Sequence, residues 1–489
     1  MTTIPPSIAL SEAGLPTVPR VHRQALLLLA GLMLLALGAL YVLAGVARPL
    51  AMALGGLIVA ALVLWDLRIG LGLFIFLAGL SPEFSLFAGT TMENLRLEDF
   101  LFPVLLLSWL LRILVHRERP VFRTPLTVPM VAVTLWGLVA TLLGVAIGTV
   151  PHASEAFFRF AKYTQYYLIF FLVYNNVRSF ADIRRMTIVF IMAAAITGLL
   201  SIYWGVTTWQ ETGVEFARAS GPAGENYNTL VGYLMQGLAL ATALALSSRG
   251  RVWRIGLGVL ALAILAAVLY THSREGYVML AATALFLAGK QYRGLILLGL
   301  LVWLASPILL PESVNERFSN TLHQIRVART DSPGGNSLTA RLYAWRYRWN
   351  GWFVKHPVQG NGIGSIPFTV DNQYLLTLVE VGIIGFGLFL WLLARLWKTL
   401  SQASRALAGT FPGVLAIGAL GALVALLVQG WAATSFATIR TMEPWWFLCA
   451  LTMAAAREAG QLSSNQSHGA PTAFNGLKGS ALASGWRTI

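Results

Sequence analysis

Residues 371–397 read DNQYLLTLVEVGIIGFGLFLWLLARLW, and this stretch decides the fold class. Its apolar part, 374–397, is long enough to cross a bilayer as an α-helix, because a spanning helix needs about 20 apolar residues. Backbone groups inside lipid must be hydrogen-bonded within their own segment, so helices are expected there and strands are not. The stretch therefore predicts a membrane-spanning helix that begins directly after Asp371 and Asn372.

Similar apolar runs recur along nearly the whole chain. The 489 residues are 57% hydrophobic and 11% charged, which is far from the composition of soluble globular proteins. Uninterrupted apolar runs also exclude a β-barrel, whose strands alternate between lipid-facing and lumen-facing residues. We expect an all-α polytopic membrane protein of about 14 transmembrane helices, at approximately 25–46, 50–65, 69–88, 100–115, 126–148, 157–175, 186–206, 227–247, 254–271, 276–289, 294–310, 374–397, 411–434 and 444–456.

The order of these runs predicts the domain organisation. The expected parts are a cytoplasmic segment (1–24), a bundle of about 11 transmembrane helices (25–310), a long extracytoplasmic loop (311–373), a bundle of about three helices (374–456) and a disordered cytoplasmic tail (457–489). The single cysteine, Cys449, can form neither an internal disulfide nor a thiolate metal cluster.

The formal net charge of +15 is distributed by topology. With the N-terminus in the cytoplasm, the basic clusters fall in cytoplasmic connections, as the positive-inside rule requires. Because membrane topology accounts for the excess of basic residues, we expect no nucleic-acid partner. The clusters are Arg117, Arg119 and Arg123; Arg184 and Arg185; Arg249, Arg251 and Arg254; Lys290 and Arg293; and Arg395, Lys398 and Arg405.

Other basic residues fall on the extracytoplasmic side, beside helix ends. Arg159 and Lys162 are three residues apart and so lie on one helical face. They could bind an anion, or they could be interfacial side chains with an Arg159–Glu155 ion pair. Arg218 and Arg274 lie in tight turns, where a charge is costly unless it is paired or faces water. These two could bind substrate, or they could pair with acids such as Glu225 and Glu275.

The long loop combines basic and aromatic residues. Positions 341, 345, 348, 349 and 352 fit one face of an amphipathic helix and hold Arg341, Trp345, Arg348, Trp349 and Trp352. One guanidinium group can donate two parallel hydrogen bonds to phosphate oxygens, and aromatic faces stack on sugar rings. This helix face therefore suits a lipid that carries phosphate and sugar. An interfacial anchor helix would use the same residue types.

The end of the loop holds the sharpest candidate residue. His356-Pro357 ends the amphipathic helix, and the glycines at 360, 362 and 364 permit backbone turns near a ligand. Asp371 then places a carboxylate at a helix start, where it could be a catalytic base or an ordinary N-cap. No Asp-x-Asp or His-Glu-x-x-His motif occurs, so the sequence predicts neither a metal site nor a cofactor.

These motifs together resemble the O-antigen ligase/polymerase family of bacterial envelope glycosyltransferases. The similarity runs from about Arg96 to Glu443 and is strongest in HPVQGNGIG and DNQYLLTLVEVGIIG, with support from RASGPAGENYN, THSREG and SLTARLYAW. The resemblance implies a GT-C-like helical fold in the bacterial inner membrane, with the active site on the periplasmic face. It also implies that Arg218 and Arg274 bind the substrate diphosphate, with Arg341, Arg159 and Lys162 assisting.

The resemblance gives the remaining residues their expected roles. Ligases of the family carry a histidine where this sequence has Asp371, which favours a polymerase with Asp371 as base. The supporting residues would be Asn372, Tyr374, Glu225, Trp345, His356 and Arg440.

The implied activity is polymerisation of an O-antigen or exopolysaccharide. The glycan would move from undecaprenyl diphosphate to a hydroxyl of the next lipid-linked repeat unit, without metal and with inversion. Expected partners are the lipid-linked donor and acceptor, membrane lipid and a chain-length regulator. The alternatives are an O-antigen ligase or oligosaccharyltransferase of the same family, and a lipid-linked oligosaccharide flippase.

Overall fold

The structure, a computed structural model, describes residues 48–81, 83–85, 94–212, 219, 221, 226–290, 292, 294, 337–366 and 371–468. Within these ranges the regular secondary structure is helical apart from an isolated bridge at Gly221 and one antiparallel pair of three-residue strands, β1 (Glu83–Ser85) and β2 (Asn94–Arg96). The chain divides into two units, Met1–Asp66 and Leu67–Ile489. The first unit contains helix α2 (Arg48–Trp65).

The second unit contains the other described helices. They are α3 (Leu67–Leu80), α4 (Leu97–His116), α5 (Thr127–Ala146), α6 (Ala153–Asn176), α7 (Phe180–Thr212), α8 (Tyr227–Ser247), α9 (Arg251–Tyr270), α10 (Arg274–Lys290), α13 (Ser337–Arg348), the π-helical turn η3 (Trp349–Phe353), α14 (Gln373–Ala406), α15 (Phe411–Gln429) and α16 (Ile439–His468).

Six of the described helices are long and apolar enough to cross a membrane: α5, α7, α8, α9, α14 and α15. A multi-pass helical membrane protein is therefore confirmed at this level, whereas the number of about 14 spans stays a prediction. The expected run 25–46 lies outside the described residues, as does the expected run 294–310 apart from its first residue.

Two expected boundaries were wrong. The run expected at 69–88 stops being helical at Leu80 and continues into β1, because Pro82 disfavours helical geometry in the residue before it. In the expected disordered tail, residues 457–468 are helical, since α16 extends to His468.

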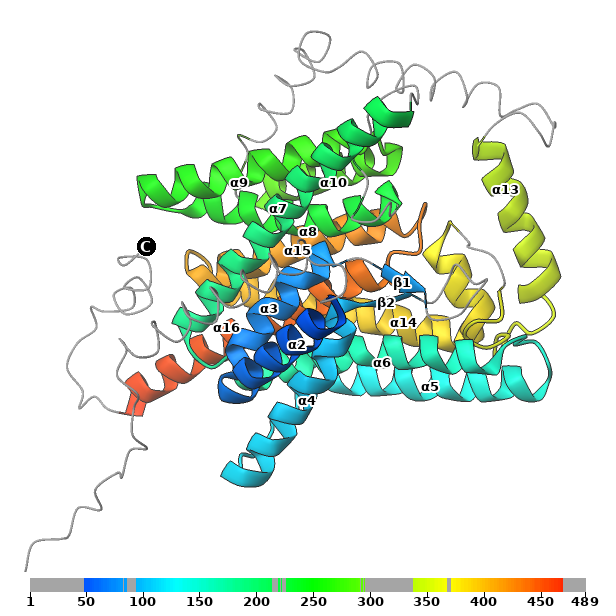
Figure 1. Cartoon of the computed structure of the whole chain (residues 1–489), viewed down its shortest axis with the longest axis horizontal. Helices are drawn as coiled ribbons and strands as arrows, with labels where there is room; N and C mark the ends of the chain where they lie inside the picture. Colours follow the sequence, from blue (N-terminus) through cyan, green and yellow to red (C-terminus); the bar gives the residue numbers. More distant parts are fainter. Residues whose placement is uncertain are drawn as a thin grey trace, which may run out of the picture. The chain divides into compact units, whose positions relative to one another are not determined.

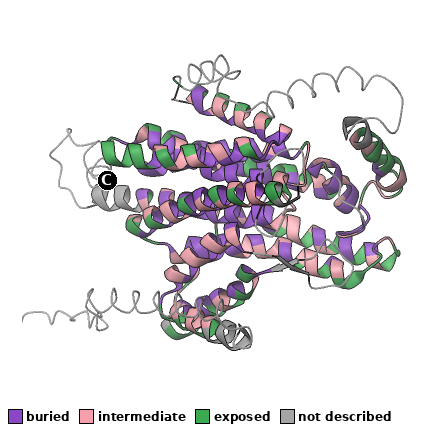
Figure 2. Ribbon diagram, turned by 45° about the horizontal axis from the view of Figure 1, so that its top comes forward, coloured by how far each residue is buried: buried purple, intermediate pink, exposed green. Residues whose placement is uncertain are grey.

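Helices α8 and α15 form the interior of the second unit. In each, 83% of the most apolar window is buried, against 28% for α9 and 33% for α5. Helix α8 packs against α7, α9, α10, α15 and α16, and Figure 2 shows the buried residues gathered on these inner surfaces. A helix that is apolar on every side either packs inside the protein, as α8 and α15 do, or faces lipid.

A second group of helices packs beside this core. Helix α14 contacts both α15 and α5, and α6 contacts both α5 and α16 (Figure 1). The space bounded by α5, α6, α14 and α16 contains the cavity described below.

Hydrogen bonds between loops show which connections share one end of the second unit. Gln373 N–H donates to the Gly430 carbonyl at 2.8 Å, Ala219 N–H donates to the Tyr270 carbonyl at 2.8 Å, and the Thr149 hydroxyl donates to the Asn361 carbonyl at 2.6 Å. We call the end of the second unit that contains these three contacts the Asp371 end. The opposite end is joined by an Arg178–Glu118 ion pair at 2.7 Å.

Candidate functional site

Asp371 lies on the surface of the Asp371 end, directly before α14. Its side chain is 48% exposed, and its Oδ2 lies 3.3 Å from Nε of Arg341, which is 34% exposed. The ion pair connects α13 to the start of α14. The carboxylate is therefore accessible to a substrate while a guanidinium lies beside it.

The N-cap of α14 is Asn372, so Asp371 does not have the N-cap role that its position also suggested. The Asn372 side chain accepts a hydrogen bond from Leu375 N–H at 3.0 Å. Tyr374 donates its hydroxyl to the Leu427 carbonyl at 2.7 Å. Asn372 thus caps α14, Tyr374 holds the first turn of α14 against α15, and Asp371 is not needed as the cap.

Helix α13 is amphipathic, as its sequence predicts. Arg341, Trp345 and Trp352 are half-buried and Arg348 is buried, whereas Tyr343 and Tyr347 are exposed. Trp345 and Trp352 pack on a small apolar cluster that consists of Phe353, Ile366, Leu375, Leu376 and Val379.

Trp349 departs from the expected face and is 45% exposed. The reason is local, because a π-helical turn begins at this residue and shifts the side-chain period.

The glycine-rich segment after His356 folds onto α14. Gly360, Gly362 and Gly364 have φ values of +79°, +95° and +78°, which confirms the expected turns. Gly362 N–H donates to the Glu380 carbonyl, and Ile383 N–H donates to the Pro357 carbonyl, both at 2.8 Å. The segment therefore fills a break in α14, where Gly382 has φ +67°. His356 is half-buried, with Nδ1 3.3 Å from Gln359 Nε2.

Arg159 and Lys162 contact different acids. Arg159 Nη1 lies 3.6 Å from Glu380 Oε1, so the Glu155 partner that the sequence suggested is replaced by a residue of α14. Lys162 is buried and forms an ion pair with Asp99 of α4. Their shared helical face thus does not give them a shared ligand.

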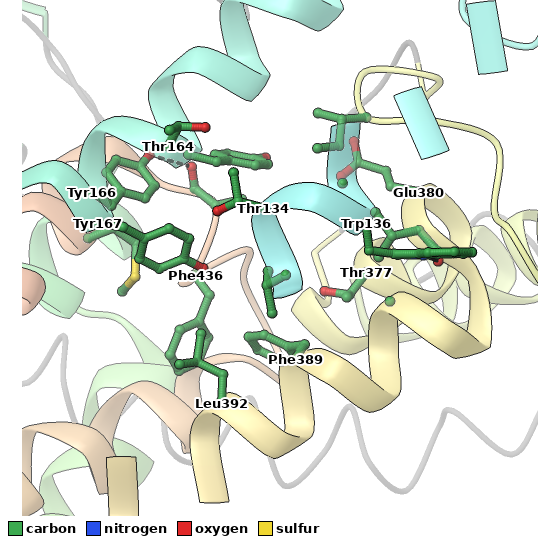
Figure 3. A pocket seen from close by; sticks show the side chains of 18 of the residues that line it. Thr134, Trp136, Thr164, Tyr166, Tyr167, Thr377, Glu380, Phe389, Leu392 and Phe436 are labelled. Carbon is green, nitrogen blue, oxygen red and sulfur yellow. Dashed lines mark hydrogen bonds between the residues drawn. The ribbon is translucent and has the colours of Figure 1, made fainter. Parts of the chain in front are cut away.

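A cavity runs along one face of α14 and is closed by α5, α6 and α16 (Figure 3). Its volume is about 100 Å³. Figure 3 shows Glu380, Trp136 and Thr377 on one side and Tyr166, Tyr167 and Phe436 on the other.

The lining of the cavity changes character along α14. Near the Asp371 end it consists of Gln373, Thr377 and Glu380, and farther along it consists of Gly385, Phe389, Leu392, Leu393 and Leu396. These positions lie on both sides of the break at Gly382. Along α14 the lining is therefore polar near the Asp371 end and apolar beyond it, whereas α5 and α6 contribute the hydroxyl groups of Thr134, Tyr163 and Thr164.

Arg274 begins α10 at the Asp371 end and is half-buried, next to the buried Glu275. Arg218 and Glu225 lie outside the described residues, as do most of their neighbours. The hydrogen bond from Ala219 to Tyr270 nevertheless brings this part of the chain to the turn between α9 and α10. Ala219 therefore contacts the end of the helix that precedes Arg274.

Arg440, an expected support residue, is fully buried and donates hydrogen bonds to the backbone at the end of α3. Its Nη1 donates to the Gly79 carbonyl at 3.1 Å, and its Nη2 donates to the Ser81 carbonyl at 2.8 Å. These bonds hold the end of α3 against α16.

Sequence reasoning missed a buried ionic cluster beside Arg440. Arg96 and Glu98 form an ion pair at 3.5 Å, and both are almost completely buried. Gln165 Nε2 donates to Glu443 Oε1 at 2.7 Å and also reaches Asp99 Oδ1 at 3.4 Å. The available signal was Glu443, a carboxylate at the edge of an apolar run, because ionisable residues at such positions need partners.

Among the described residues no group of three or more His, Cys, Asp or Glu could hold a metal ion. No protein-family model matches the sequence, and no curated protein matches it either. The resemblance to the O-antigen ligase/polymerase family thus rests on sequence motifs alone.

Proposed function

We propose that this chain is a membrane glycosyltransferase that polymerises lipid-linked glycan repeat units. The observation that carries the proposal is the polarity of the cavity along α14. An aromatic and aliphatic lining suits an isoprenoid chain, and the polar end suits a diphosphate and its sugar. The accessible Asp371 lies at the same end of α14 as the polar part of the cavity.

Asp371 is proposed as the base. It would remove the proton from an acceptor hydroxyl as that oxygen bonds to the anomeric carbon of the donor sugar. The bond from this carbon to the diphosphate oxygen breaks, and the lipid diphosphate departs with the electron pair. A positioned base of this kind contributes about 10²–10⁴-fold to the rate.

Arginines are proposed to stabilise the departing diphosphate. Arg159 lies beside the polar end of the cavity through its contact with Glu380, and Arg341 lies beside Asp371. Guanidinium groups favour the charge that develops on the leaving oxygen. Arg218 and Arg274 keep the role that the resemblance gives them.

The test is incubation of the purified protein with a polyprenyl-diphosphate-linked repeat unit. A ladder of longer lipid-linked glycans is expected, because donor and acceptor are then the same molecule. Transfer that requires a separate acceptor would favour the ligase instead. Movement of intact lipid-linked glycan across vesicles without new glycosidic bonds would favour the flippase.

A further inference from the structure

The carboxylate of Glu380 is a buried anion at the polar end of the cavity. The residue is 3% exposed, and it lines the cavity together with Gln373 and Thr377. A buried carboxylate is costly unless cationic or N–H groups surround it. The surroundings of Glu380 provide both kinds of group.

Two groups from different parts of the chain converge on one carboxylate oxygen. Gly364 N–H donates to Glu380 Oε1 at 3.0 Å, and Arg159 Nη1 lies 3.6 Å from the same oxygen. A backbone N–H and a guanidinium are the groups that proteins use to bind phosphate oxygens. Glu380 thus lies where an anionic ligand of this cavity would be bound.

The two interactions differ in strength. The bond from Gly364 has ordinary hydrogen-bond length, whereas 3.6 Å is too long for a hydrogen bond from Arg159. Arg159 could therefore turn to a new anion while Glu380 keeps its bond to the backbone.

From this geometry we propose that Glu380 is an internal anion that competes with the substrate diphosphate for Arg159. The inference rests on the proposed function and adds a residue that controls affinity. Between substrates the carboxylate neutralises Arg159. A bound diphosphate displaces that contact, and after transfer the carboxylate recovers Arg159 and thereby weakens the hold on the lipid diphosphate product.

The test measures binding of farnesyl diphosphate to the purified full chain in detergent. Glu380→Gln keeps an oxygen that accepts from Gly364 and removes the charge, so the affinity should rise about three- to tenfold, corresponding to about 0.7–1.4 kcal/mol. Polymer formation by this variant should slow, because product release becomes slower. Glu155→Gln removes a carboxylate from the same region of α6 and should leave the affinity unchanged.

Two further comparisons keep the result interpretable. Farnesol has the same chain without phosphate, so its affinity should not respond to Glu380→Gln; an equal rise for farnesol would overturn the inference. In Arg159→Gln, the additional change Glu380→Gln should no longer raise the affinity for farnesyl diphosphate. A rise that persists without Arg159 would show that the two side chains do not compete in this way.

The outcomes also separate this inference from the proposed function. If the wild-type chain polymerises lipid-linked units but Glu380→Gln leaves affinity and turnover unchanged, only the role of Glu380 is lost. If wild-type protein binds farnesyl diphosphate no better than farnesol, the proposed function fails and the inference fails with it.

Discussion

At the scale of single residues, the position of Asp371 differs from that of three buried acids in the same part of the molecule. Glu380, Glu275 and Glu443 are buried, whereas nearly half of the Asp371 side chain is exposed. Because Asn372 caps α14, the Asp371 carboxylate has no capping role.

We predict that Asp371→Asn lowers the rate of chain elongation by about 10²–10⁴-fold, since an amide cannot accept the acceptor proton. The protein should remain folded and inserted, because Asp371 is exposed. Product length on gels and the melting temperature in detergent test both statements. Wild-type polymer lengths in this variant would refute the assignment.

The neighbouring residue supplies a matched control. Asn372→Ala removes the bond to Leu375 and should lower the free energy of unfolding by about 1 kcal/mol.

Single residues also show what the sequence could and could not predict. The amphipathic face of α13 followed from its 3.6-residue period, and the turns at Gly360, Gly362 and Gly364 followed from residue type. The partner of Arg159 could not be predicted, because Glu380 is 221 positions away and Glu155 is available one turn away on the same helix. Only packing of α6 beside α14 decides between them.

At the scale of elements, the break in α14 is held open by a segment outside the helix. Gly382 has φ +67° and ψ −172°, a region that is essentially restricted to glycine. A Cβ at this position would collide with the backbone of Val358 and Gly360. The glycine-rich segment after His356 can therefore pack into the break in α14 only while residue 382 has no Cβ.

We predict that Gly382→Ala lowers the free energy of unfolding by about 2–4 kcal/mol, through backbone strain and overlap with the inserted segment. Gly387→Ala is the matched control, since a Cβ there meets nothing within 4 Å on the same helix. Thermal unfolding of both variants in detergent measures the difference. Equal melting temperatures would contradict this account of the break.

The buried ionic cluster joins four elements. Arg96 belongs to β2, Asp99 belongs to α4, Lys162 and Gln165 belong to α6, and Glu443 belongs to α16. Its members come from distant parts of the chain, so their mutual contacts could not be predicted from local pattern. What the sequence does contain is a set of acids and bases at the edges of apolar runs.

We expect Asp99→Asn to lower the free energy of unfolding by about 3–5 kcal/mol, because it leaves the buried Lys162 ammonium without its nearest carboxylate. Lys162→Met in the same chain should recover part of that loss. The comparison is a double-mutant cycle of melting temperatures. Strictly additive effects would show that the two side chains do not act as a pair.

At the scale of the whole molecule, sequence hydropathy correctly predicted a helical membrane protein. It did not predict where α3 and α16 end. Hydropathy measures how readily residues enter lipid, and it does not report where the backbone stops being helical. The grouping of loops at the Asp371 end depends on helix direction, which alternates from one helix to the next.

The proposed function requires that the Asp371 end faces away from the cytoplasm. Two exposed positions at opposite ends test this orientation, Ala153 at the start of α6 and Ala408 between α14 and α15. In intact cells a membrane-impermeant maleimide should label Ala153→Cys, and it should label Ala408→Cys only after permeabilisation. The reverse pattern would exclude an extracytoplasmic site.

The unmodified chain is the background control for this labelling. Cys449, its single cysteine, is fully buried and should not react.

The Arg341–Asp371 ion pair has one more consequence, which concerns ionic strength. Both partners are substantially exposed, and exposed pairs contribute only about 0–1 kcal/mol and are screened by salt over about 8 Å at physiological concentration. The contact of α13 with the start of α14 thus has an electrostatic part that the medium can weaken. Activity should respond to salt in the surrounding solution, whereas the buried contacts of the cavity should not.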